Sequence, residues 1–308
     1  MNFRRSEFDV TNRVNTTDPV CVRLEVARIH RALYSRPDAP QLLQAFDDLA
    51  RLYRGDYAGY SACDTGYHDM QHIMEVTLAM ARLLDGYERS RGDGVPIPER
   101  IFQLGVICAL FHDCGYIRRR GDKKHRNGAA YTSTHVSRGA KLLKAYLPTI
   151  GMSEFADVAG QIVHFTGYER PVATIRLTAP IFKLIGSFLG SADIIAQMSD
   201  RCYLEKCRDR LFPEFVVGGI THKMTPKGDV VVFSSAEDLV RKTPNFYQTA
   251  AKRLDNDLGG AYQFAKAHFG GNNLYMDAVK QNVRFAERLG AGAELTLRRQ
   301  PPPSATSH

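Results

Sequence analysis

The stretch "TGYHDMQHIMEV", residues 65–76, places two histidines, His68 and His72, four residues apart at the start of an amphipathic helical pattern. Four residues make about one helical turn, so both imidazoles are expected on the same face of a helix. That face otherwise carries Met, Ile and Val, which belong in a hydrophobic core. Two titratable rings that face a core need an explanation, which we look for in the rest of the chain.

The composition is that of a globular protein with anionic partners. The 308 residues are 44% hydrophobic and 24% charged, with a net charge of +8, which favours phosphate compounds. Nucleic acid is a less attractive partner because no known motif accompanies the charge. No run approaches the ~18 apolar residues of a membrane span, and the amino terminus lacks the apolar core of a signal peptide. We therefore expect a cytoplasmic protein without a membrane partner.

Cysteine usage agrees with that compartment. The six cysteines are scattered without a C-x-x-C pair. A disulfide framework is therefore not expected, and the thiols are interpreted as small buried hydrophobic groups.

Helical periodicity dominates the chain and predicts an all-α fold. One segment, near residues 216–235, contains "TPKGD" between β-branched residues and predicts a small β-hairpin. We expect an N-terminal extension over 1–20, one helical domain over 21–290 and a disordered tail over 291–308. Helices are expected over 22–34, 39–52, 70–84, 98–111, 133–146, 154–164, 179–189, 193–211, 246–255, 260–268 and 274–289.

Further His and Asp side chains fall in apolar helical surroundings. A carboxylate inside an apolar run is costly without a cation or strong donors, as in "ICALFHDCGY" and "FLGSADIIAQMSD". Each such residue alone is more often a satisfied core or surface side chain. Together they lie on separate predicted helices, and the core of one bundle could gather them around metal ions. The candidate ligands are His72, His112, Asp113, His135, His164 and Asp193.

A nitrogen and oxygen donor set without thiolates suits Mn, Fe, Zn or Mg better than a structural zinc. Six ligands exceed one tetrahedral centre, so we expect two divalent metal ions with a bridging carboxylate, which can hold a hydroxide and phosphoryl oxygens. The basic stretch "RRRGDKKHR", residues 118–126, follows the His-Asp doublet. Lys123, Lys124 and Arg126 are its candidates for binding substrate phosphate, and a plain solvated loop is the alternative.

The order H…HD…H…H…D resembles the HD-domain superfamily of metal-dependent phosphohydrolases. "YHDMQHIMEV" looks like the YHNxxHxxxV signature of its cyclic-nucleotide phosphodiesterase-like branch. "GSADIIAQMSDRCYLEKCRDRLFPEF" is similar to the helix that follows the last metal-binding Asp in bacterial HD proteins. The resemblance covers about residues 66–215 and implies an HD-type helical bundle with the metal-site core in that range.

The resemblance also implies roles for individual residues. It makes Asp113 a catalytic carboxylate that bridges the two ions, and it makes His68 a general acid that is not a ligand. An imidazolium there would protonate the departing ester oxygen. By the same resemblance the first site would be formed by His72, His112, Asp113 and Asp193, and the second would be completed by His135 and His164.

The expected function is hydrolysis of a small anionic phosphate ester, a cyclic nucleotide or related nucleotide, by a metal-activated hydroxide. Two alternatives stay open. One is an HD-type mixed-valence diiron oxygenase, which uses six comparable ligands. The other is a catalytically idle nucleotide-binding protein. A homodimer is also left open by the sequence.

Overall fold

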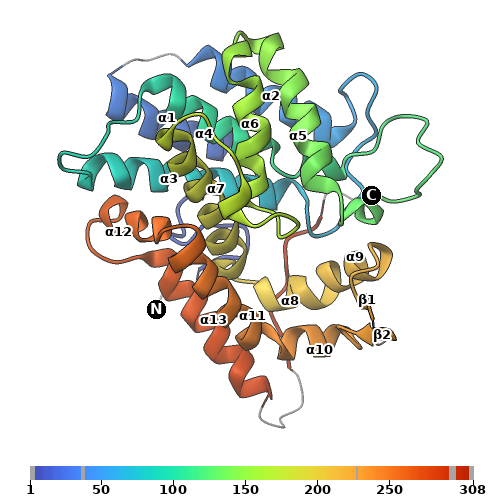
Figure 1. The fold of residues 1–308 in the computed structure, drawn as a ribbon. Coiled ribbons are helices and arrows are strands. Elements are labelled where there is room, and N and C mark those ends of the chain that lie inside the picture. The colour runs from blue at the N-terminus through green and yellow to red at the C-terminus, as the bar shows by residue number, and fades with distance from the viewer. Residues whose placement is uncertain (1–3, 36–38, 227, 291–295, 305–308) are drawn as a thin grey trace.

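The computed structural model describes residues 4–35, 39–226, 228–290 and 296–304, and it confirms a helical protein with one small hairpin. Figure 1 shows α1–α6 gathered in one half of the view, α8–α11 and α13 in the other, and α7 between them. The elements are α1 (Pro19–Tyr34), α2 (Pro40–Arg54), α3 (Met70–Ser90), α4 (Glu99–Phe111), α5 (His135–Tyr146), α6 (Ala156–Ile162), α7 (Pro180–Ser199), α8 (Tyr203–Lys206), α9 (Phe212–Val217), β1 (His222–Thr225), β2 (Gly228–Val231), α10 (Ala236–Arg241), α11 (Thr243–Lys252), α12 (Ala265–His268) and α13 (Leu274–Gly290).

The central helix is α3, which packs against α1, α4, α7 and α12. Leu, Met and Ala, which are strong helix formers, supply seven of its 15 buried residues. The predicted end at residue 84 is wrong. Asp85 interrupts the apolar pattern there, but its carboxylate is buried and bonds to His268 at 2.5 Å and to Arg89 at 2.6 Å. A tertiary contact therefore extends the helix past the point where its sequence periodicity stops.

Helix α7 corrects a second prediction. The sequence suggested a break between residues 189 and 193, yet α7 runs unbroken through Gly190. A Cβ atom at Gly190 would lie 2.5 Å from the carbonyl oxygen of Phe165, so the glycine allows close packing rather than a turn. By length and composition alone α7 could cross a membrane, but 67% of its most apolar window is buried inside the protein.

The predicted hairpin is confirmed, but it is shorter than the segment 216–235. Strands β1 and β2 pair antiparallel, with His222 opposite Val231 and Thr225 opposite Gly228. Residues 212–217 form α9 instead, where Glu214 is buried. Most of the hairpin's side chains are exposed, so it adds little to the core.

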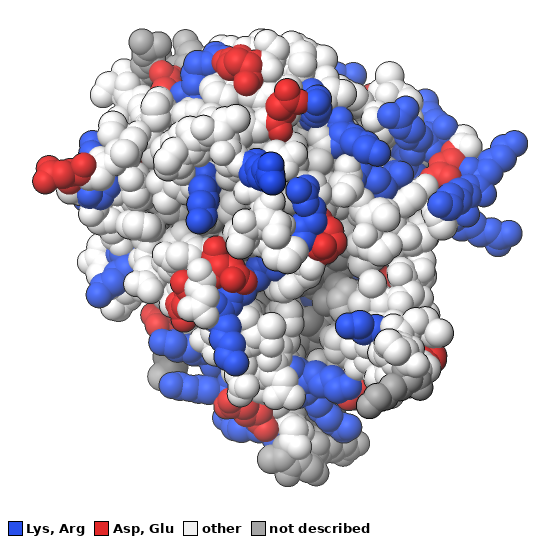
Figure 2. Space-filling model, in the orientation of Figure 1, with Lys and Arg blue, Asp and Glu red and all other residues white. Residues whose placement is uncertain are grey.

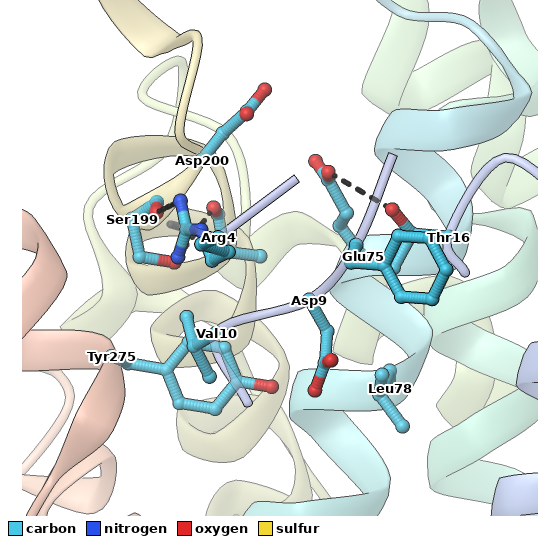
Figure 3. Close-up of a pocket in the computed structure, with 11 residues that line it drawn as sticks. Arg4, Asp9, Val10, Thr16, Glu75, Leu78, Ser199, Asp200 and Tyr275 are labelled. Carbon is cyan, nitrogen blue, oxygen red and sulfur yellow. Dashed lines mark hydrogen bonds between the residues drawn. The ribbon is translucent and has the colours of Figure 1, made fainter. Parts of the chain in front are cut away.

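The N-terminal residues 4–18, expected as part of an extension, pack against α3 and α7. Asp9 pairs with the buried Arg82 at 2.5 Å, and Arg4 donates to the Ser199 carbonyl at 2.6 Å. This segment helps line a small pocket of about 20 Å³. Figure 3 shows the residues that line it, with Glu75 among them. Burial raises the pKa of Glu75 to about 8.

Residues 296–304, which belong to the segment expected to be a disordered tail, form neither helix nor strand. The Arg299 backbone N–H donates to Glu205 at 3.1 Å. The Pro302 carbonyl accepts a hydrogen bond from Arg210. Specific hydrogen-bond partners thus hold a segment whose composition is typical of disorder. Residues 291–295 and 305–308 lie outside the described residues.

Candidate metal centre

The N-terminal cap of α3 fixes the position of His72. The Asp69 side chain accepts a hydrogen bond from the His72 backbone N–H at 3.1 Å, and its other oxygen lies 3.3 Å from Arg210. The helix begins at Met70, so His68 precedes it, and the expectation that both imidazoles project from one helical face is wrong. Their ring centroids are nevertheless only 5.7 Å apart. The loop, not the helix, supplies the second imidazole.

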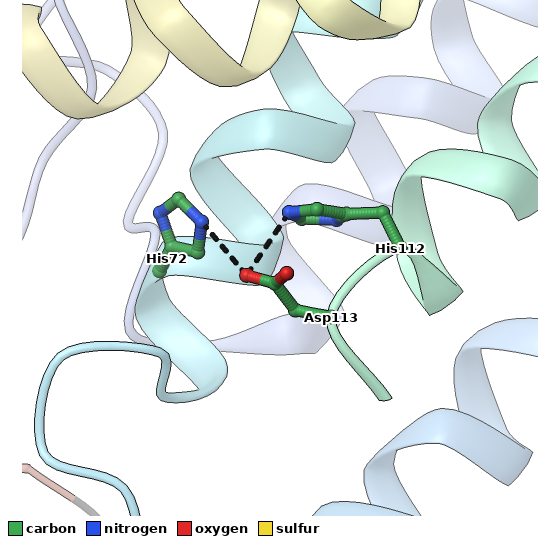
Figure 4. Close-up of side chains that lie close together, drawn as sticks. All are labelled: His72, His112 and Asp113. Carbon is green, nitrogen blue, oxygen red and sulfur yellow. Dashed lines mark ion pairs between the residues drawn. The ribbon is translucent and has the colours of Figure 1, made fainter. Parts of the chain in front are cut away.

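His112 and Asp113 follow the buried helix α4. The chain leaves the helix at Asp113 and enters a 3-10 turn, which turns this carboxylate toward α3. Its Oδ2 lies 3.3 Å from Nε2 of His72 and 3.2 Å from Nε2 of His112 (Figure 4). The three side chains are buried and together could hold a metal ion.

The other oxygen of Asp113 faces a different helix. Its Oδ1 lies 3.4 Å from Nε2 of His135, the first residue of α5. This approach depends on Gly115, because a Cβ atom there would overlap the backbone carbonyl of His135. The two oxygens of one carboxylate therefore serve imidazoles on opposite sides, as a bridging ligand would.

Asp193 completes the group from α7. Its Oδ1 lies 3.6 Å from Nε2 of His72 and 3.9 Å from Nε2 of His112. The structure therefore brings five of the six predicted ligands together. The sixth, His164, is buried but forms its ion pair with Glu169 at 2.8 Å; within the described ranges it makes none with the clustered carboxylates.

Two of the histidine rings, those of His112 and His135, are oriented in the way metal ligands require. Nδ1 of His112 donates to the Ala109 carbonyl at 2.7 Å, and Nδ1 of His135 donates to the Thr132 carbonyl at 2.6 Å. Such bonds leave the Nε2 lone pairs free for a metal. Nε2 of His112 is fully buried and has no hydrogen-bond partner, although a carboxylate oxygen is near. A lone pair and a carboxylate at this distance repel each other unless a proton or a metal cation lies between them, so the donor set fits a metal ion that replaces the proton.

The electrostatics of the group also favour a cation. Burial acts to lower the pKa of His112, but the charge of Asp113, with help from Asp193, raises it to about 9. Burial acts to raise the pKa of Asp113, yet the imidazoles hold it well below its usual range. Without a metal, the two carboxylates therefore retain a proton on His112, and a divalent ion would take its place.

His68 has a different environment. Its Nδ1 lies 2.5 Å from Oε2 of the buried Glu214, and its ring stacks on Tyr116 with centroids 4.3 Å apart. Tyr116 also stacks on His135, at 4.4 Å. Burial opposes the imidazolium, but Glu214 outweighs it and raises the pKa of His68. This arrangement holds a proton beside the candidate ligands.

Sequence reasoning missed Glu214, Tyr116 and Glu169. For Glu214 a signal existed. The acid in "LFPEF" stands among apolar residues, as does the acid in the His-Asp doublet, so burying it carries the same cost unless it has a partner. Glu169 is in a loop and Tyr116 follows the doublet in an ordinary turn, so neither carries a pattern that would mark its role.

The basic loop extends away from the body of the protein. Figure 2 shows Lys and Arg side chains gathered at the right edge, over the protruding loop of Figure 1. Lys123, Lys124 and Arg126 are exposed, and in the described part of the chain their side chains form no ion pair. Arg118 is instead held by Asp64 at 2.8 Å. The structure thus brings none of the three phosphate candidates into contact with the cluster.

Comparisons with family models, with curated proteins and with solved structures find no match for this chain. The chemistry is therefore inferred from the geometry of the site. A carboxylate shared between imidazoles can hold cations, and an acid-backed histidine beside it can deliver a proton.

Proposed function

We propose that this chain is a metal-dependent phosphoric ester hydrolase of the HD-domain type, with a nucleotide or cyclic nucleotide as substrate. The observation that carries the proposal is the carboxylate of Asp113, whose two oxygens face His72 and His112 on one side and His135 on the other. A purely structural histidine cluster has no need of this arrangement, whereas a bridged pair of divalent ions does.

Two ions, Mn, Fe, Mg or Zn, are the proposed cofactors. The first would be held by His72, His112, Asp113 and Asp193, and the second by Asp113 with His135 and His164. For the second, the Glu169 carboxylate orients His164 by accepting from its Nδ1. When bound, the ions would supply Lewis acidity toward phosphoryl oxygens and an acidified water.

His68 is the proposed general acid. It lies near His72 but has its Nδ1 on Glu214, so Nε2 is the atom that would carry the proton to the leaving ester oxygen. Glu214 favours the protonated ring, which suits a donor better than a base. Tyr116 fixes the plane of the ring by stacking.

The test is turnover by purified protein supplied with Mn²⁺ or Mg²⁺, screened against cyclic nucleotides, dinucleotides and nucleoside monophosphates. We expect oxygen-independent hydrolysis of at least one ester, lost in Asp113→Ala. Bound iron with oxygen uptake on addition of substrate would replace the proposal with the diiron oxygenase. Tight nucleotide binding without turnover would reject the hydrolase and favour the alternative of a catalytically idle nucleotide-binding protein.

A further inference from the structure

The loop that follows the candidate ligand His164 carries one unusual residue, Tyr168. Large hydrophobic side chains that are exposed in the described part of the chain include aliphatic residues and Met224, but Tyr168 is the only aromatic among them, at 58% exposed. The other tyrosines and phenylalanines of that part are at least partly covered. An exposed ring beside a polar site calls for a reason other than core packing.

The backbone on the N-terminal side of Tyr168 is held by a buried cation. Arg253 is 6% exposed and donates from one guanidinium nitrogen to the carbonyl oxygens of Phe165 and Gly167, both at 2.7 Å. The same guanidinium carbon lies 4.1 Å from the centre of the Tyr168 ring. One face of the ring is therefore covered by a fixed cation, and its position is determined before any ligand arrives.

The location of the ring is set by its neighbours. The next residue, Glu169, bonds to the candidate ligand His164 at 2.8 Å. Desolvation of the hydroxyl raises the pKa of Tyr168, Arg253 opposes this effect, and the charge of Asp193 adds to it. The Phe165 carbonyl that Arg253 holds packs against Gly190 of α7, about one helical turn before Asp193, and Glu169 ties the loop to His164.

We propose that Tyr168, backed by Arg253, is the platform on which the aromatic base of a nucleotide stacks while its phosphate occupies the metal centre. The inference rests on the proposed function for the position of the phosphate. A flat ring held on one face by a cation leaves its other face for a planar partner, and aromatic stacking tolerates any base. Tyr168 therefore binds the base rather than taking part in the chemical step.

Binding can be tested without turnover, because the chain contains no Trp. Tyr168→Trp introduces a single fluorescent reporter at the proposed platform. With Mg²⁺ present, we expect adenosine 5′-monophosphate to quench its fluorescence to saturation and ribose 5-phosphate to leave it unchanged. The matched control is Val95→Trp, at a position that is 67% exposed. It lies beyond the end of α3, and its carbonyl accepts a hydrogen bond from Tyr87, which is about 22 Å along the helix from His72. Quenching that is equal in both variants, or that does not saturate, would overturn the inference.

Kinetics separate this inference from the proposed function. For a hydrolysed cyclic nucleotide, we expect Tyr168→Ala to raise KM by about 5- to 100-fold with kcat little changed. Tyr168→Phe should keep the parent KM, and the abasic ribose cyclic phosphate should not distinguish the variants. Tyr168→Leu fills similar space without an aromatic ring and serves where the alanine variant folds poorly. Turnover with the same KM in all variants would reject the platform and leave the hydrolase in place. An absence of turnover would reject the hydrolase, while the fluorescence titration still decides the platform.

Discussion

Two buried polar clusters meet at the start of α3, and consecutive residues point into them. Gln71 belongs to the cluster of Lys206 and Asp200, whose charged atoms lie 2.5 Å apart, with the Gln71 carbonyl 2.9 Å from the ammonium. His72 belongs to the cluster of Asp113. In the first cluster a cation of the chain meets an anion of the chain. In the second, the imidazole nitrogens face carboxylate oxygens, and among the described residues no Lys or Arg forms an ion pair with those carboxylates.

This difference separates a structural cluster from a functional one. Asp200 also accepts a hydrogen bond from the Cys202 backbone at 2.9 Å, so each charge of the first cluster has its partner within the fold. The second cluster leaves Nε2 of His112 buried and unpartnered. That nitrogen lies near the carboxylates of Asp113 and Asp193, so a cation shared by the three groups would satisfy all of them.

The largest expected effect comes from removing the bridging carboxylate. Asp113→Ala should reduce bound metal to background and abolish turnover while the helical circular dichroism signal is kept. Asp200→Ala is the matched control, since it removes an equally buried carboxylate from the neighbouring cluster. We expect that variant to lose stability but to keep its metal per folded molecule. Full metal content in Asp113→Ala would contradict the bridging role.

Next in size is the proton donor. His68→Ala should keep the bound metals and lower kcat by roughly 10²–10⁴-fold, because it removes general-acid assistance to the leaving group. The effect should shrink for esters with good leaving groups, which need no proton. Glu214→Gln should also lower kcat, but by a smaller factor, because it weakens the protonation of His68 without removing the ring. If His68→Ala hydrolyses an ester with a poor leaving group at the parent rate, His68 has no part in the mechanism.

Stability tests the structural cluster. Lys206→Met should lower the free energy of unfolding by about 3–5 kcal/mol, because Asp200 is left as an unpaired buried charge. Urea unfolding of the metal-free protein measures this. The double variant Lys206→Met with Asp200→Leu should recover much of the loss, since two apolar groups replace the pair. A single variant as stable as the parent protein would show that the pair is not truly buried.

The smallest effect concerns pH. Burial acts to raise the pKa of Asp200, but Lys206 outweighs it and holds the pKa below its ordinary value. The folded state thus favours the carboxylate, and its stabilising contribution is present above the unfolded pKa of about 3.9 and is lost as pH falls below it. Asp200→Asn should flatten the decline of unfolding free energy between about pH 5 and pH 3. A slope that stays the same would assign the acid sensitivity to other carboxylates.

The sequence located much of this centre because burial leaves a readable pattern. Asp113 and Asp193 stand out as acids in apolar runs, and His72 and His112 lie where helices begin or end. The all-α fold followed from periodicity in the same way. These features are local, so a single chain shows them.

The missed features depend on residues far apart in the chain. Glu214 reaches His68 across 146 positions, and the course of α7 through Gly190 is decided by Phe165. Residues 296–304 likewise form hydrogen bonds with the distant residues Glu205 and Arg210. Local propensity at these places points to a turn or a free tail, and tertiary contacts override it.

The central claim is that these residues form a metal centre. The most direct test is a calorimetric titration of chelator-treated protein with Mn²⁺, together with metal analysis of the complex after dialysis. We expect saturable binding by the parent protein, retained in Lys206→Met and lost in both His112→Ala and Asp113→Ala. A parent protein that binds no Mn²⁺, Fe²⁺, Zn²⁺ or Mg²⁺, or a His112→Ala variant that binds as the parent does, would contradict a metal centre at this position.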